Sequence, residues 1–275
     1  MIRLKDKLKL LEAAANPVSV QGAIKLLDTS FCFLPSVHFI AAVTKHGKTN
    51  FAANLTCSTL AQQDKKVFVA MNEETAPDFL SRCACIFTGF SFTSWKNGQC
   101  SSEQKRTLVA KMTDIVKHID FVDDEIMNMG CIEDVVSAVK AASQNEQTAL
   151  VIFDYLQNVY LSKDFPGKTQ YELSKLLGTR FKDIGKTTQC PIVVFGQLKD
   201  ATDMGFKSRV EGDSWFVNNV ASGLELVADK LAKQSRIIIH TDRFQNRQHD
   251  EFHFKHSPSG RLVSIAKPEG VDDEA

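Results

Sequence analysis

Short apolar runs alternating with longer helical stretches are the feature that most constrains the fold of this chain. The early runs are nearly continuous in Val, Ile, Phe and Leu, as strands buried on both faces of a parallel sheet are. Helical segments separate them, which is typical of βαβ units. We therefore expect an α/β fold with a mostly parallel, doubly wound sheet. The runs are Ser36–Val43, Val67–Met71, Ile119–Val122, Ala149–Leu156, Pro191–Leu198, Leu224–Ala228, Arg236–His240, Glu251–Lys255 and Leu262–Ile265.

The two ends of the chain differ from this pattern. The last runs are joined by short turns such as Ser257-Pro258-Ser259-Gly260, which predicts a C-terminal antiparallel hairpin. At the start, residues 1–16 carry the apolar stripe of an amphipathic helix, and Pro17 ends it. We expect three parts: a linker-type helix within residues 1–19, one domain over residues 20–268 and an acidic tail over residues 269–275.

The charge balance limits how the chain can meet a polyanion. Lys and Arg together number 33, as do Asp and Glu, so the formal net charge is zero. This excludes a cationic surface that wraps nucleic acid, and any polyanion must be bound by a local group of charges. No apolar run approaches the roughly 20 residues that a membrane helix needs, so we expect no membrane contact.

The cysteines and histidines predict neither disulfides nor a metal site. The 7 cysteines include no C-x-x-C pair, which favours free thiols packed as small apolar side chains in a reducing compartment. His253 and His256 are close in sequence, but on a strand they would point to opposite faces. With no signal peptide at Met1–Lys7, we expect a cytoplasmic protein, in the host cytoplasm if phage-encoded.

The strongest chemical signal is Gly47-Lys48-Thr49, which lies between the strand Val37–Ala42 and the helical run Asn50–Gln63. This is the context of a phosphate-binding P-loop, although Ala42 stands where the motif usually begins with glycine. Lys48 would reach phosphate oxygens and the Thr49 hydroxyl would hold Mg²⁺, with a nucleoside triphosphate such as ATP as ligand. Backbone N–H groups would cradle the phosphates along Thr44, Lys45, His46, Gly47, Lys48, Thr49 and Asn50.

Polar side chains at the ends of three neighbouring strands extend this site. Asp154 ends an apolar run, where a carboxylate polarises the Mg²⁺ shell. Glu73 follows Met71, at the edge of the sheet where a carboxylate could deprotonate an attacking water. Gln197 ends another run, where an amide could sense the γ-phosphate. For Asp154 and Gln197 the alternative is ordinary hydrogen bonding at the end of a strand.

These segments together resemble the C-terminal ATPase domain of replicative DnaB-family helicases, which have the RecA fold. The resemblance spans roughly residues 20–265, and Asp154-Tyr155-Leu156-Gln157 is its most specific part. It implies that Glu73 is the catalytic carboxylate, Asp154 the Walker B residue and Gln197 the sensor. It also implies a homo-oligomer, a hexamer, with single-stranded DNA and a primase or helicase loader as partners. The chain is expected to lack the usual N-terminal domain of the family.

The resemblance also implies an arginine finger supplied by a neighbouring subunit. The run Arg236–Arg243 fits the strand that carries it, which makes Arg243 the candidate. Such an arginine stabilises charge on the transferring phosphoryl group. Thr241 stands where the family usually has a lysine. The finger could instead be Arg247, and Arg243 could be a surface residue on an edge strand.

DNA contacts are expected from two segments. The segment after Gln197 offers Lys199, Lys207, Arg209 and Gly212, and its Arg209-Val210-Glu211-Gly212 resembles the family's Arg-Glu-Ser-Gly loop. The stretch 159–182 offers Lys163 and Lys168 with interleaved aromatic residues, as stacking on bases would require. The alternative for this stretch is the solvated face of an amphipathic helix.

The sequence therefore predicts an ATP-hydrolysing, ring-forming DNA helicase that translocates on single-stranded DNA and unwinds duplex during replication. Two alternatives remain: a recombination ATPase of the RecA or RadA type acting on single-stranded DNA, and a degenerate nucleotide-binding replication subunit. Because the net charge is zero, we expect DNA binding to be weak for a monomer and salt-sensitive once a ring has formed.

Overall fold

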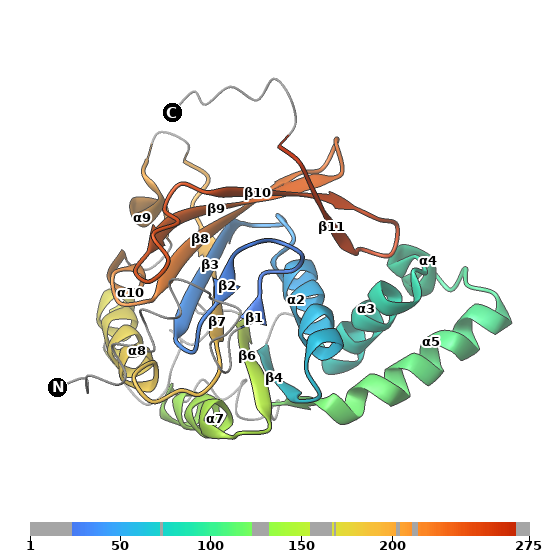
Figure 1. Cartoon of the computed structure of the whole chain (residues 1–275), viewed down its shortest axis with the longest axis horizontal. Coiled ribbons are helices and arrows are strands. Elements are labelled where there is room, and N and C mark those ends of the chain that lie inside the picture. The colour runs from blue at the N-terminus through green and yellow to red at the C-terminus, as the bar shows by residue number, and fades with distance from the viewer. Residues whose placement is uncertain are drawn as a thin grey trace.

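A mixed sheet of 9 strands organises the chain, with the strand order β11-β10-β9-β8-β3-β7-β6-β4-β5 (Figure 1). The computed structural model describes residues 24–71, 74–122, 132–154, 167, 169–201, 204–210 and 214–267. The strands are β3 (Val37–Val43), β4 (Lys66–Met71), β5 (Ile119–Phe121), β6 (Thr148–Asp154), β7 (Ile192–Leu198), β8 (Ser222–Asp229), β9 (Gln234–Asp242), β10 (Glu251–His256) and β11 (Leu262–Ile265).

The sheet has a parallel half and an antiparallel half. Strands β8, β3, β7, β6, β4 and β5 pair in parallel, so their carboxyl ends meet at one edge of the sheet. Strands β8, β9, β10 and β11 pair in antiparallel fashion, and β10 and β11 form the C-terminal hairpin. The predicted fold class is confirmed, and every apolar run overlaps a strand, although the bounds differ.

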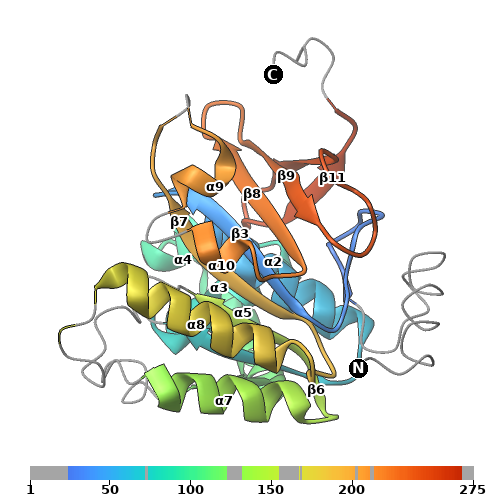
Figure 2. The ribbon, with the colours of Figure 1, turned by 90° about the vertical axis from the view of Figure 1, so that its left-hand side faces the viewer.

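Helices cover both faces of the parallel half. α2 (Lys48–Gln62) packs on β4 and β6, and α3 (Ala76–Thr88) packs on α2. α7 (Ile132–Gln144) and α8 (Gln170–Ile184) lie on the opposite face, toward the viewer in Figure 2. Among the described residues, the remaining helices are α4 (Phe92–Lys96), α5 (Ser102–Ile115), the short 3₁₀ helix η2 (Val116–His118), α9 (Phe206–Arg209) and α10 (Ser214–Val217).

Alternation along the strands divides the buried apolar side chains into two clusters, one on each face of the sheet. On β3, Ile40 and Ala42 belong to the cluster beneath α2, whereas Phe39 and Ala41 belong to the cluster beneath α8. Glycine is required at position 196 of β7, where the ring of Phe39 on the neighbouring strand β3 packs closely. A Cβ on Gly196 would lie 2.4 Å from that ring. The face on which a strand-end residue points is therefore fixed by its position in this alternation.

Two local features differ from the sequence-based expectations. α2 begins at Lys48 rather than at Asn50, so that Lys48 and Thr49 form its first turn. A small hairpin of β1 (Ile24–Lys25) and β2 (Cys32–Phe33) precedes the sheet. Each of its strands has 2 residues, which is too short for an alternation to show in the sequence.

Cysteines, metal-binding clusters and membrane-spanning helices can be compared with the predictions for the described residues alone. Their six cysteines (Cys32, Cys57, Cys83, Cys85, Cys100 and Cys190) are free and buried, as expected. Over the same residues, no cluster of His, Cys, Asp and Glu is arranged to hold a metal ion. No helix within the described ranges has both the length and the apolar character to cross a membrane. The predicted terminal helix (residues 1–19) and acidic tail (residues 269–275) lie outside the described ranges.

Candidate nucleotide-binding site

The turn between β3 and α2 has the geometry of an anion-binding loop. It is closed by the His46 N–H, which donates to the Val43 carbonyl at 3.1 Å. Lys45 (φ 66°) and Gly47 (φ 87°) both have left-handed backbone conformations, and Gly47 is the N-cap of α2. Such conformations turn successive N–H groups toward a common point. The first turn of α2 has no acidic residue, so its positive end is free to face an anion.

Two residues of the first turn of α2 supply side chains to this loop. Lys48 is buried, with 6% of its surface exposed, and Thr49 is half-buried. The Thr49 hydroxyl donates to Oδ2 of Asp154 at 3.4 Å, and Asp154 is fully buried at the end of β6. The structure thus brings together the two residues that the sequence assigned to Mg²⁺. A hydroxyl beside a carboxylate fits that ion, which prefers oxygen ligands.

The strand register places the remaining predicted residues along the same edge. Gln197 of β7 pairs with Ala42, the last but one residue of β3. By alternation, Gln197 and Asp154 both point to the face of the sheet that carries α2. Met71 of β4 pairs with Asp154. Glu73 follows two residues after Met71 and lies outside the described residues.

Two side chains of the loop bond to the backbone of other segments. Nδ2 of Asn50 donates to the Gly260 carbonyl at 2.9 Å, so its side chain holds the β10–β11 turn and only its backbone remains for phosphate. The His46 ring accepts from the Ala228 N–H at 3.4 Å. Burial and the charges of Lys230 and Lys48 lower the pKa of His46, partly offset by nearby carboxylates, which favours a neutral ring. Thr44 and Lys45 are exposed.

The two arginine-finger candidates lie at the opposite edge of the sheet. Arg243 follows β9 and is exposed, and its guanidinium donates to the Asn218 carbonyl. Arg247 is held within the chain: it pairs with Asp250, donates to Ser30, and lies 5.5 Å over the ring of Phe252. Of the two, Arg243 is the more available to a neighbouring molecule.

The predicted DNA contacts differ in their surroundings. Lys199 and Lys207 are exposed. Arg209 has only 14% of its side chain exposed, because Nη1 pairs with Oε1 of Glu225 at 2.9 Å. The guanidinium thus faces into the protein, a difference from the expected surface position. Gly212, Lys163 and Lys168 lie outside the described residues.

Comparison with known proteins identifies the family. The model of the DnaB-like helicase C terminal domain matches residues 24–209, which is more than half of the chain. The chain belongs to this family. Two curated relatives are the replicative DNA helicase DnaC of Bacillus subtilis, 22% identical over 58% of this chain, and the replicative DNA helicase DnaB of Geobacillus stearothermophilus, 20% identical over 60%. The chain covers 34% and 36% of their lengths, about a third.

Solved structures agree with the fold of this DnaB-like domain. One of them, an isolated ATPase domain, superposes with a TM-score of 0.75 at 14% identity, covering 97% of this chain and 100% of the other. A DnaB-like replicative helicase, described with its interactions with primase, gives 0.70 at 15% identity, covering 84% and 58%. The RadB recombinase gives 0.56 at 13% identity, covering 88% and 95%. These likenesses confirm the RecA-like ATPase fold of the DnaB-like domain.

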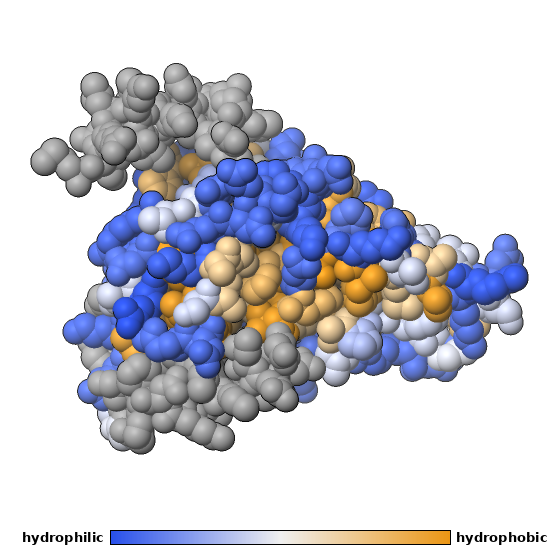
Figure 3. Space-filling view, turned by 90° about the horizontal axis from the view of Figure 1, so that it is seen from below, coloured by the Kyte–Doolittle hydropathy of each residue, from blue (hydrophilic) through white to orange (hydrophobic). Residues whose placement is uncertain are grey.

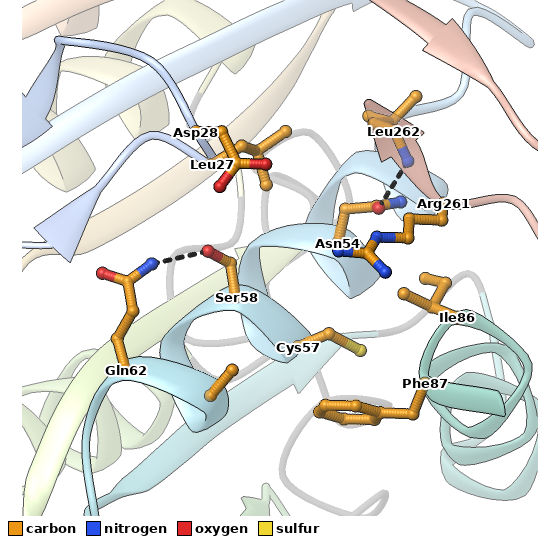
Figure 4. A pocket seen from close by; sticks show the side chains of 11 residues that line it. Leu27, Asp28, Asn54, Cys57, Ser58, Gln62, Ile86, Phe87, Arg261 and Leu262 are labelled. Carbon is orange, nitrogen blue, oxygen red and sulfur yellow. Dashed lines mark hydrogen bonds between the residues drawn. The ribbon is translucent and has the colours of Figure 1, made fainter. Parts of the chain in front are cut away.

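Two cavities lined by described residues lie away from the loop 44–50. One, of about 280 Å³, is lined by α2, α3 and the two hairpins, and Figure 4 shows Asn54, Cys57 and Arg261 around it. The other, of about 320 Å³, lies between α2, α3 and α5. Neither is lined by a residue of the loop 44–50. A phosphate site of this kind is an open turn at the edge of a sheet, not an enclosed cavity.

Sequence reasoning missed Glu225 and His240. Glu225 is buried in β8, and besides Arg209 it pairs with Nε2 of His240 at 2.9 Å. A single glutamate in the apolar run Leu224–Ala228 was the available signal, because a carboxylate is buried in a sheet only when it is paired. Its partners lie 16 residues before and 15 residues after it in the sequence, so they could not be identified from local pattern.

Proposed function

We propose that this DnaB-like domain hydrolyses ATP and acts as the motor of a ring-forming replicative DNA helicase that moves on single-stranded DNA. The observation that carries the proposal is the approach of Thr49 to the buried Asp154, next to Lys48 and the left-handed turn at Gly47. A strand-end carboxylate and a helix-start hydroxyl meet in this way where a nucleoside triphosphate is bound with Mg²⁺.

Each residue of the site has a role in the proposed reaction. The N–H groups of the loop 44–50 bind the β- and γ-phosphates, and Lys48 stabilises their charge. Glu73 accepts a proton from the attacking water while the water oxygen bonds to the γ-phosphorus. The bond between the γ-phosphorus and the oxygen that bridges it to the β-phosphate breaks, and ADP leaves. Gln197 contacts the γ-phosphate and responds to its loss. Mg²⁺, beside Thr49 and Asp154, would supply positive charge at the phosphate oxygens.

The proposed DNA contacts come from the segment that follows Gln197. Lys199 and Lys207 are exposed cations there, and in a ring a few such residues are repeated by symmetry. This repetition reconciles DNA binding with a net charge of zero. Seen from below, apolar residues gather in the middle of the face, with hydrophilic residues above them (Figure 3), and exposed apolar surface of this kind is often an interaction site.

The test measures ATP hydrolysis with and without single-stranded DNA. We expect DNA to stimulate turnover, and Lys48→Ala or Glu73→Gln to lower it by at least about a hundredfold, because each removes stabilisation of the transition state. Lys117→Ala is the matched control: Lys117 is exposed on η2, which precedes β5 and so lies at the opposite edge of the sheet. Undiminished turnover in Glu73→Gln would disprove its role as the base.

Images of the protein with ATP and DNA test the proposed assembly. Closed rings support a helicase, whereas helical filaments would favour a recombination ATPase on the same fold. A wild-type protein that binds ATP without hydrolysing it would point instead to a degenerate nucleotide-binding subunit.

A further inference from the structure

The segment after β7 folds back and closes on itself. Leu198 and Val210 form an isolated antiparallel bridge, and the Lys199 N–H donates to the Arg209 carbonyl at 2.7 Å. Nε of Arg209 returns a bond to the Lys199 carbonyl at 3.4 Å. The loop 198–210, of which residues 202 and 203 lie outside the described ranges, is therefore closed at its two ends. It begins one residue after Gln197, the proposed γ-phosphate sensor.

Side-chain contacts fasten this loop to β8 and β9. Arg209 pairs with Glu225 of β8, and the other carboxylate oxygen of Glu225 meets Nε2 of His240 on β9. The ring of Phe206, at the start of α9, stacks on the His240 ring with centroids 4.3 Å apart and planes 10° apart. We call these four residues, Phe206, Arg209, Glu225 and His240, the Arg209 cluster.

Burial and charge both indicate that the ion pair in this cluster is strongly held. The side chain of Glu225 is 7% exposed and that of Arg209 is 14% exposed. Burial acts to raise the pKa of Glu225, but the hydrogen bond from His240 and the charge of Arg209 outweigh it, so the net pKa is lowered. An ionised carboxylate in this position requires its partners, since a buried charge is costly without them.

The position of the cluster connects it to the phosphate site. Glu225 pairs with Ala41 of β3, and Gln197 pairs with Ala42, the next residue along the same strand. The cluster lies on the face of the sheet opposite α2, where Ala41, Phe206 and Val210 belong to one apolar cluster. The loop is thus tied at one end to the sensor strand and at the other to the neighbour of the P-loop strand.

We infer that the Arg209–Glu225 pair fixes the loop 198–210 against β8 and β9, so that Arg209 is a positioning residue and not a direct ligand of DNA. The inference rests on the proposed function where it concerns DNA. In the proposed function, Lys199 and Lys207 contact the DNA strand, and Arg209 holds the loop that carries these two lysines. Loss of the pair removes neither lysine but lets the loop that carries them move independently of Gln197.

Two substitutions test this inference against the alternative that Arg209 binds DNA directly, because that alternative predicts opposite effects of the two on DNA binding. Arg209→Gln and Glu225→Gln each remove one charge of the pair. If Arg209 bound DNA directly, Glu225→Gln would release it and strengthen DNA binding, whereas Arg209→Gln would weaken binding. If the pair positions the loop, both variants lower the ratio of DNA-stimulated to basal turnover, by roughly 3- to 30-fold, and the double variant is no worse than the more affected single variant.

Lys207→Gln is the matched control, because Lys207 is exposed on α9 two residues before Arg209. We expect it to reduce the slope of log affinity against log salt by about 0.7 for each subunit that contacts the single strand, as loss of a phosphate contact does. Arg209→Gln should leave that slope unchanged. A reduced slope in Arg209→Gln, or tighter DNA binding in Glu225→Gln, would overturn the inference.

Hydrogen exchange in the absence of DNA and nucleotide separates this inference from the proposed function. Peptides covering 198–210 should exchange faster in Arg209→Gln and Glu225→Gln than in the wild type or Lys207→Gln, while the peptides of β3 and β6 stay protected. Protected β3 and β6 peptides also show that the variants are folded. Unchanged exchange over 198–210 overturns the inference even if DNA stimulates ATP hydrolysis, and faster exchange supports it even if DNA does not.

Discussion

His38 is a histidine that the fold keeps neutral. It lies on β3 and is 1% exposed. Its Nε2 bonds to the Leu34 carbonyl at 2.8 Å, so the proton is on Nε2, and Nδ1 accepts from the Ser222 hydroxyl at 2.8 Å. Burial lowers the pKa of His38 from 6.5 to about 4, against small opposing effects of the Leu34 carbonyl and Asp242. Both ring nitrogens are satisfied without a charge.

This lowered pKa predicts a loss of stability in mild acid. Above pH 6.5 His38 is neutral in both the folded and the unfolded chain, and its neutral contacts stabilise the fold fully. As the pH falls from about 6.5 toward about 4, only the unfolded chain takes up a proton, and the free energy of unfolding drops by up to about 3 kcal/mol. Urea unfolding of wild type and His38→Gln measures the effect. The variant should be less stable near neutral pH, and the two curves should converge in acid; curves that stay parallel would contradict the assigned pKa.

At the scale of elements, Asn54 joins α2 to the C-terminal hairpin. It is 3% exposed, its Nδ2 donates to the Gly260 carbonyl at 2.9 Å, and its Oδ1 accepts from the Leu262 N–H at 2.8 Å, as Figure 4 shows for Leu262. Asn54→Leu has a side chain of similar size but leaves the buried Leu262 N–H without its partner, whereas the Gly260 carbonyl keeps its bond from Asn50. We therefore expect it to lower the free energy of unfolding by about 2 kcal/mol. On the same helix, Gln62 bonds to Ser58 in an exposed position. Gln62→Ala should therefore cost less than about 0.5 kcal/mol. Equal costs for the two variants in denaturant unfolding would show that Asn54 does not hold the hairpin.

Asn54 also shows where prediction from the sequence ends. The strands were predictable because each is a buried run with its own apolar signature, and the turn at Gly47-Lys48-Thr49 because it depends on local backbone geometry. The pairing of Asn54 with the β10–β11 turn joins residues 206 and 208 positions apart, and no local pattern records it. The burial of Arg209 could not be predicted for the same reason: its type suggested a DNA contact, and its buried partner Glu225 lies on β8, outside the local sequence.

At the scale of the whole molecule, the direction of β9 separates Arg243 from its own phosphate loop. β9 runs antiparallel to β8, and Asp242 pairs with Ser222 at the start of β8, beside His38 near the start of β3. The Arg243 N–H donates to the Ala221 carbonyl at that same edge. The phosphate loop begins at the other end of β3, and that 7-residue strand is about 20 Å long. An arginine at this distance can serve only the site of another copy.

This separation predicts that two inactive variants restore activity when mixed. Lys48→Ala lacks the proposed phosphate ligand but keeps Arg243, whereas Arg243→Ala keeps the loop and lacks the proposed arginine finger. In rings assembled from equal amounts, about one interface in four joins an intact loop to an intact arginine, so turnover should recover to about a quarter of the wild-type rate. ATP hydrolysis by the mixture, after joint unfolding and refolding or co-expression, measures this.

The matched control uses Arg247→Ala in place of Arg243→Ala. In the wild-type protein the Arg247 guanidinium is already bonded to Asp250 and Ser30. That variant should be less stable but active alone, because its arginine is structural. If Arg247→Ala is inactive and is the variant that complements Lys48→Ala, the finger is Arg247; if neither mixture recovers activity, the site does not take an arginine from a neighbouring subunit.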